Sequence, residues 1–162
     1  MLYGETVARL SATGASLPFR FGTVVADREA LATLVADREP EWLERLGAVR
    51  DKVEMVVHAE TPTAPAPDPP ITGREYVMRR VTRQREHDRL VAGLTLAVGD
   101  LASELRELRT TDGMRLAVLV PEGAVTDLCA ALEQWQGEEP GRAAWATGPW
   151  PPFSFTTSAG TP

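Results

Sequence analysis

The sequence predicts an α+β fold, and three patterns support this prediction. Residues 53–60 alternate between one apolar and one mostly polar face, as a half-buried strand does. Residues 114–120 are apolar on both faces, which is typical of an inner strand. Between these strands, apolar residues recur at spacings of three and four from Val91 to Leu108, which indicates a helix that packs on a sheet.

The composition indicates a globular cytoplasmic protein. The 162 residues are 43% hydrophobic and 25% charged, and the formal net charge of −6 argues against general binding to nucleic acid. The single cysteine, Cys129, cannot form an intrachain disulfide, so a reducing compartment is expected. Residues 1–14 include Glu5 and Arg9 and no long apolar run, so neither a signal peptide nor membrane insertion is expected.

Residues 1–52 are expected to form a small, incomplete N-terminal α/β lobe. Residues 2–12 have the spacing of a short amphipathic helix. In residues 17–25, apolar residues alternate with Pro18 and Arg20 before a β-branched run, which predicts a strand. A single strand cannot form a sheet alone, so this one would pair with the main sheet, with another chain, or with nothing stable.

Two helices are expected to follow in this lobe. Asp27 is a good N-cap for a helix that ends near Glu39. Pro40 would then open a second helix that runs to about Lys52.

The rest of the chain, residues 53–162, is expected to form a ferredoxin-like domain. Residues 61–71 predict an extended linker, because residues 61–70 contain five prolines. Thr72 would cap a long helix over residues 73–109, and the turn at Asp112 and Gly113 leads into strand 114–120.

A helix over residues 122–136 and a last strand over 142–147 complete the predicted domain. Cys129 lies on the apolar side of this helix, where a small core residue is expected rather than a nucleophile. The resulting order of strand, helix, strand, helix, strand predicts a ferredoxin-like sandwich with one strand missing or altered.

The first half of the long helix is locally basic. Its arginines are Arg74, Arg79, Arg80, Arg83, Arg85 and Arg89. We favour a solvated face over a face that binds phosphate or an acidic partner.

The segment from Gly148 to Phe155 joins a stiff backbone to three large aromatic side chains. Pro149, Pro151 and Pro152 restrict the backbone, while Trp150, Phe153 and Phe155 need a surface to contact. We favour closure of the protein's own core over docking of another chain, because tethered aromatic residues are more often core.

No catalytic, metal or cofactor site is indicated. The sequence has no glycine-rich phosphate loop, no nucleophile elbow and no histidine or cysteine pair at ligand spacing. His58 lies on the wetter face of strand 53–60 and is expected to be a surface residue. The chain is therefore not expected to be an enzyme.

Three motifs give the chain a resemblance to a known family. They are Leu17-Pro18-Phe19-Arg20-Phe21-Gly22-Thr23-Val24, Thr72-Gly73-Arg74-Glu75-Tyr76-Val77-Met78-Arg79-Arg80, and Thr147-Gly148-Pro149-Trp150-Pro151-Pro152-Phe153-Ser154-Phe155. In this order they resemble the GvpF/GvpL gas vesicle protein family over nearly all of the chain. The resemblance implies an accessory protein that binds the hydrophobic shell subunit and other accessory proteins during gas vesicle assembly. It also implies an N-terminal α/β lobe followed by a ferredoxin-like domain.

The chain departs from this family at its N-terminus. Family members usually begin with a further strand and helices before the segment that matches residues 1–14. That strand is an expected neighbour of residues 17–25. A shortened paralogue, a misplaced start and a lobe completed by a partner chain are all open explanations.

The candidate interaction and structural residues come from these motifs. They are Phe19, Arg20, Phe21, Gly22, Tyr76, Arg79, Arg80, Gly148, Pro149, Trp150, Pro151, Pro152 and Phe153. The alternative function is a regulatory or ligand-binding ferredoxin-like module without catalysis, which would need a concave pocket.

Overall fold

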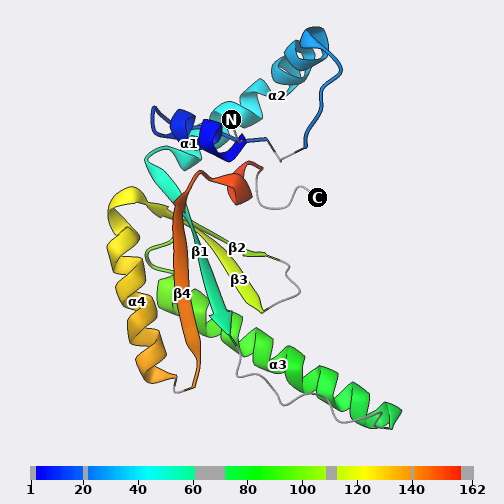
Figure 1. Ribbon diagram of the computed structural model, residues 1–162, viewed down its shortest axis with the longest axis vertical. Helices are drawn as coiled ribbons and strands as arrows, with labels where there is room; N and C mark the ends of the chain where they lie inside the picture. Colours follow the sequence, from blue (N-terminus) through cyan, green and yellow to red (C-terminus); the bar gives the residue numbers. More distant parts are fainter. Residues whose placement is uncertain (1–2, 20–21, 61–71, 109–112, 140, 158–162) are drawn as a thin grey trace.

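The computed structural model describes residues 3–19, 22–60, 72–108, 113–139 and 141–157, and these form an α+β structure (Figure 1). Strands β1 (Lys52–Glu60), β2 (Glu104–Leu108), β3 (Met114–Pro121) and β4 (Ala143–Trp150) make an antiparallel sheet in the order β2-β3-β1-β4. The predicted strands at 53–60, 114–120 and 142–147 are thereby confirmed.

Two helices cover one face of this sheet and bury the main core. They are α3 (Gly73–Val98) and α4 (Val125–Glu138), the latter preceded by the 3₁₀ turn η1 (Glu122–Ala124). The core consists of alternate strand residues and the inner stripes of the two helices, including Met55, Val57, Leu116, Val118, Leu90, Leu94, Val98, Leu128 and Leu132. Apolar residues that recur at every second position in the strands and at every third or fourth position in the helices therefore form one buried layer.

The opposite face of the sheet carries a second, smaller core at one end. Helix α1 (Tyr3–Ser11), helix α2 (Arg28–Val49) and the C-terminal 3₁₀ turn η2 (Phe153–Phe155) lie there (Figure 1). Val49, Ala117, Leu119 and Phe155 are buried together, and Phe155 is completely inaccessible. The last turn of α2 and the C-terminal segment therefore pack on the sheet face that α3 and α4 leave open.

The prediction of two helices over residues 27–52 is wrong, because α2 continues through Pro40. A proline inside a helix leaves the carbonyl four residues earlier without its hydrogen-bond donor. Both Ala36 and Pro40 are exposed, so water can satisfy that carbonyl. The predicted N-cap is confirmed: the Asp27 carboxylate accepts a 2.8 Å hydrogen bond from the Ala30 amide.

The prediction of a helix over residues 73–109 is correct only as far as Val98. Residues 104–108 form edge strand β2, although Leu105 and Leu108 continue the helical spacing. In the strand these two leucines contact opposite faces of the sheet, since Leu105 packs on the main core and Leu108 on the smaller one. Thr72 stands at the N-cap position of α3, but its side chain makes no capping hydrogen bond.

The predicted strand over residues 17–25 is absent from its described part, residues 17–19 and 22–25. Gly22 has a φ of 85° at a turn, which interrupts an extended strand. The Phe19 carbonyl accepts a hydrogen bond from the Tyr3 hydroxyl of α1 rather than from a neighbouring strand. Phe19, a described residue of this segment, instead contacts Tyr3 of α1 and Trp42 of α2.

Two further expectations concern Cys129 and the predicted linker. Cys129 is exposed, so its assignment to the core is wrong. The buried face of α4 follows Leu128, Leu132 and Trp135, and Cys129 lies beside this stripe. The predicted linker at 61–71 lies outside the described residues.

The motif at the end of β4 forms an irregular edge of the sheet. Thr147 pairs with Val56 and Trp150 with Glu54, so Gly148 and Pro149 together oppose the single residue Met55. The Gly148–Pro149 peptide bond is cis. An edge strand tolerates this proline, because its missing N–H is not required by a second neighbour.

Gly148 cannot be replaced by a larger residue without strain. Its φ is 135°, and an added Cβ would lie 2.7 Å from the Met55 sulfur and 2.9 Å from the Glu54 carbonyl oxygen. Gly148→Ala is therefore expected to lower the free energy of unfolding by about 2 kcal/mol. Urea unfolding followed by circular dichroism measures this change.

Gly47→Ala is the matched control, because Gly47 lies in α2 with no atom within 4 Å of its added Cβ. It is expected to leave stability unchanged or raise it by up to about 1 kcal/mol. Equal behaviour of the two variants would contradict the steric account.

Candidate functional site

Two of the three motifs meet at one hollow, which we call the aromatic groove. The groove has a volume of about 760 Å³ and lies between residues 17–19 and Thr23, α2, the end of β2 and the C-terminal segment. Its lining residues are Leu17, Pro18, Phe19, Thr23, Arg38, Trp42, Leu46, Arg106, Glu107, Leu108, Phe153, Ser154, Thr156 and Thr157.

Aromatic side chains form the apolar part of this groove and remain accessible. The Phe19 ring packs edge-on against Trp42, with 5.8 Å between the ring centroids. The Phe153 ring lies 6.5 Å from that of Tyr3 in α1. Phe19 keeps 43% and Phe153 38% of its surface exposed, so each is held by a neighbouring ring but not covered.

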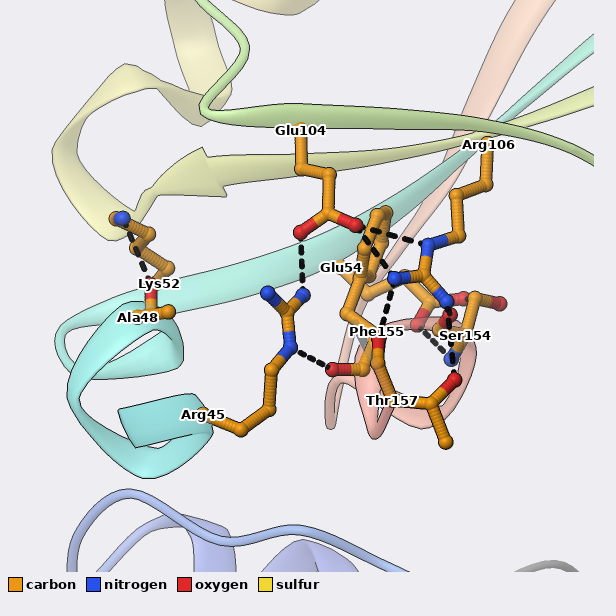
Figure 2. Close-up of polar contacts among 9 residues, drawn as sticks. All are labelled: Arg45, Ala48, Lys52, Glu54, Glu104, Arg106, Ser154, Phe155 and Thr157. Carbon is orange, nitrogen blue, oxygen red and sulfur yellow. Dashed lines mark hydrogen bonds and ion pairs between the residues drawn. The ribbon is translucent and has the colours of Figure 1, made fainter. Parts of the chain in front are cut away.

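A partly buried network of ion pairs and hydrogen bonds beside the groove holds the C-terminal segment in place (Figure 2). We call Arg45, Glu54, Glu104 and Arg106 the anchor network. Arg45 of α2 donates from Nε to the Phe155 carbonyl at 2.5 Å and pairs through Nη2 with Glu104 of β2. The network thus connects α2, the sheet and the C-terminal turn.

Arg106 makes further contacts to Glu104 and to the C-terminal segment. Its guanidinium donates to Glu104 Oε1 from Nε at 2.9 Å, to the Ser154 carbonyl from Nη1 at 2.8 Å, and to the Thr157 carbonyl from Nη2. It also lies 5.2 Å from the centre of the Phe155 ring, where a cation–π contact is favourable. One arginine therefore holds three successive parts of the C-terminal segment.

Glu54 completes the network from β1. The sequence places it on the wetter face of its strand, but it is only 4% exposed, because the C-terminal turn covers it. Its two carboxylate oxygens accept hydrogen bonds of 2.7 Å from the Ser154 amide and hydroxyl. The expected solvent exposure of this strand face is therefore wrong at Glu54.

The two carboxylates of the network have opposite pKa shifts. Burial raises the pKa of Glu54, although the Ser154 hydrogen bonds and the nearby Arg106 charge offset part of this effect. Burial also opposes ionisation of Glu104, but hydrogen bonds and charge from Arg45 and Arg106 outweigh it and lower the pKa of Glu104. Glu104 is therefore the firmly ionised partner of the two arginines.

The predicted site residues that the structure describes lie in four places: the groove with its adjacent turn, a second hollow, the β4 bulge and helix α3. Phe19 and Phe153 line the groove, Gly22 forms the adjacent turn, and Arg20 and Phe21 lie outside the described residues. The other residues of the C-terminal motif line a separate hollow of about 480 Å³ beside α1, where Trp150 is half-exposed and Pro152 is buried: Pro149, Trp150, Pro151 and Pro152. Gly148 lies in the β4 bulge.

The third motif does not join the groove. Tyr76, Arg79 and Arg80 lie in the N-terminal half of α3, and all three are exposed. Tyr76 and Arg80 line a hollow of about 440 Å³ with Met114 at the start of β3.

Sequence reasoning missed Arg45, Arg106 and Trp42 as site residues. The available signal was weak: Arg106 stands in a short strand between Glu104 and Glu107, and Arg45 stands on the apolar face of α2. A buried arginine needs a carboxylate partner. That partner comes from a strand which the sequence predicted as helix.

The accessible rings of the groove offer apolar surface for contact with another molecule. Among the described residues, no group of three or more His, Cys, Asp or Glu side chains could hold a metal ion. His58, expected at the surface, is half-buried: its ring stacks on Trp145 and contacts the Thr147 hydroxyl at 2.9 Å. Within the described chain, no helix has the length and apolar character needed to cross a bilayer.

Removing one arginine of the anchor network is expected to loosen the C-terminal segment. Arg45→Met deletes the donor to Phe155 and one partner of Glu104, so the free energy of unfolding should fall by about 2–3 kcal/mol. Arg38→Met is the control, since Arg38 makes an exposed, 3.8 Å pair with Glu41 whose loss should cost no more than about 0.5 kcal/mol. Equal losses in urea unfolding would contradict a special role for Arg45.

The raised pKa of Glu54 gives a pH dependence of defined sign. The folded state binds the Glu54 proton more tightly than the unfolded chain does, so this residue costs stability as pH rises from its ordinary value of 4.5 through its raised value. Glu54→Gln cannot titrate and lacks this loss. As the pH rises from 4.5 towards neutrality, the wild type should therefore lose unfolding free energy relative to Glu54→Gln. A difference between the two proteins that does not change with pH would contradict the burial of an ionisable Glu54.

Comparisons with known proteins agree with the resemblance in the sequence. The family model described as "Gas vesicle synthesis protein GvpL/GvpF" matches residues 1–157. Gas vesicle protein F of Streptomyces sp. (strain CB03234) is 30% identical over 138 residues, which are 85% of this chain and 52% of that protein. The chain therefore spans about half the length of this curated relative.

Solved structures match the fold. The crystal structure of GvpF from Anabaena sp. PCC7120 has a TM-score of 0.73 at 16% identity and covers 94% of this chain and 70% of its own. The structure of GvpF from Microcystis aeruginosa has a TM-score of 0.70 at 16% identity and covers 95% and 74%. At this identity the likeness concerns the fold, and the family assignment rests on the sequence matches. The chain belongs to the gas vesicle synthesis protein GvpL/GvpF family.

Proposed function

We propose that this chain is an accessory protein of gas vesicle assembly that binds the hydrophobic shell subunit, and other accessory proteins, through the aromatic groove. The observation that carries this proposal is the pair of accessible rings, Phe19 and Phe153, that line one hollow. Its cellular place would be the cytoplasm and the gas vesicle, and its role would be non-enzymatic.

The groove has the physical properties that such binding requires. A protein that shields an apolar subunit needs an exposed apolar surface on a rigid support. The anchor network supplies the support, because Glu54 and Arg106 bind the backbone N–H and C=O of Ser154, the residue that follows Phe153. Binding then requires little ordering of the groove, which lowers its entropic cost.

The organisation into an incomplete N-terminal lobe and a ferredoxin-like domain forms part of the same proposal. The element order β1-α3-β2-β3-α4-β4 and the sheet order β2-β3-β1-β4 support the ferredoxin-like assignment. The proposed boundary after residue 52 has less support, since an ion pair between Arg45 of α2 and Glu104 of β2 crosses it.

The alternative function is a regulatory or ligand-binding module that uses the same hollow. A volume of about 760 Å³ is within the range of small-molecule sites, and Arg38 at its edge would favour an anionic group. This alternative predicts a rise in melting temperature with a small ligand and no effect on the shell subunit.

Phe153→Ala is expected to weaken binding of the shell subunit about 30-fold while the protein stays folded, because a central aromatic contact contributes about 2 kcal/mol. The measurement is retention of the shell subunit on immobilised protein, together with light scattering of the subunit at an equimolar ratio. Circular dichroism checks the fold.

Leu96→Ala is the control, since Leu96 is an exposed apolar residue of α3 and does not line the groove. It should bind as the wild type does. If the wild-type protein neither retains the subunit nor reduces its aggregation, the proposed function is wrong. If Phe153→Ala binds normally, the groove is the wrong surface.

A further inference from the structure

Two helices extend half of their length away from the body of the protein (Figure 1). In α3, residues 73–86 are all exposed. In α2, residues 28–40 are exposed except for Ala30 and Leu34, which are half-buried. Most of a helix's stability in a protein comes from packing of one face, so these halves are unusually bare.

The two bare halves carry opposite charge. Residues 74–89 of α3 contain six arginines and three acidic residues. Residues 29–44 of α2 contain five acidic residues and one arginine. In the described structure, none of the six α3 arginines makes an ion pair within 4 Å, so their charge is available to a partner.

The basic half of α3 has one face that continues the core. Tyr76, Arg80, Arg83 and His87 precede Leu90 at spacings of three and four, which places them on the buried stripe of the helix. Beyond the sheet the described residues of this stripe remain accessible: Tyr76 is 61% exposed beside a hollow of about 440 Å³. The result is an aromatic residue surrounded by arginines.

The outer side of α2 has the complementary arrangement. Ala32, Ala36 and Leu43 follow one another at helical spacing, and Leu43 is 60% exposed. Acidic residues flank this narrow apolar strip, and all of them are exposed: Glu29, Asp37, Glu39 and Glu44. An apolar centre with a charged rim is the usual composition of a protein interface.

We propose that these surfaces bind each other between two copies of the chain, so that the basic half of α3 in one copy packs on the acidic side of α2 in the next. The two surfaces cannot meet within one copy, because they lie at opposite ends of the molecule (Figure 1). The contact is therefore head-to-tail. Such a contact leaves one free surface at each end, and repetition gives an open chain or a ring.

The physical character of this contact follows from its composition. Exposed charges attract strongly only at low ionic strength, so the association is salt-dependent. Two short helical faces bury less area than a permanent interface does, so the association is also weak and concentration-dependent.

The first test is sedimentation velocity of the purified full chain over a range of concentrations at low and high salt. The wild type should self-associate at low salt and dissociate at high salt. Arg79→Glu, Arg80→Glu and Arg83→Glu together should weaken self-association at least about tenfold, because like charges would then face each other. The matched control is Arg74→Glu, Arg85→Glu and Arg89→Glu, which makes the same charge change on the other side of α3 and should have a much smaller effect.

A charge swap distinguishes a head-to-tail contact from other modes. Asp37→Arg, Glu39→Arg and Glu44→Arg on α2 should also abolish self-association, since both surfaces are then basic. Mixed in equal amounts with the α3-reversed variant, this protein should associate again, because each free surface finds an opposite one. Circular dichroism and unfolding midpoints check that every variant is folded.

Three results would overturn the proposal. They are a wild type that stays monomeric at low salt and high concentration, an equal effect of the control reversal, and no recovery on mixing the two reversed variants. A variant that self-associates normally but no longer binds the shell subunit would bear only on the aromatic groove. The two proposals can therefore be disproved independently.

Discussion

The structure depends on one interaction, in which Arg45 and Arg106 share the carboxylate of Glu104 below the C-terminal segment. Arg45 comes from α2 and Arg106 from β2, and both donate to backbone carbonyls of the last described turn. Charges removed from water are stable only when they are paired and hydrogen-bonded, so each member requires the others. Through this network Phe155 fills the second core and Phe153 is left at the mouth of the groove.

The sequence predicts the parts of this fold whose signals are local. The alternation in β1, the apolar run in β3 and the stripe of α4 each specify their element, and Asp27 specifies the start of α2. The errors occur where local signals are ambiguous. Leu105 and Leu108 fit a helix and a strand equally well, and only pairing with β3 decides for the strand. Residues 17–19 resemble a strand by alternation, but their neighbour is helix α1 rather than a strand edge.

The candidate site is predictable in part for the same reason. Phe19 and Phe153 are conspicuous as aromatic residues in stiff segments, but nothing local indicates that positions 134 residues apart share one groove. Arg106 and Glu54 have charges that would suit a solvated strand face. Their burial follows from the return of the C-terminal segment over the sheet, which is a long-range feature without a sequence period. Trp42 is predictable as an apolar helix residue, but its contact with Phe19 depends on the turn at Gly22.

On the proposed function, the aromatic groove contacts the gas vesicle shell subunit. The most direct measurement replaces Phe153 with a photo-crosslinkable phenylalanine analogue in cells that produce the shell subunit, with the same analogue at Leu96 in a parallel strain. Because Phe153 lies at the groove and Leu96 on the exposed side of α3, the account predicts a crosslinked product with the shell subunit at position 153 and little or none at position 96. Equal crosslinking at both positions, or none at position 153 with normal protein levels, would contradict it.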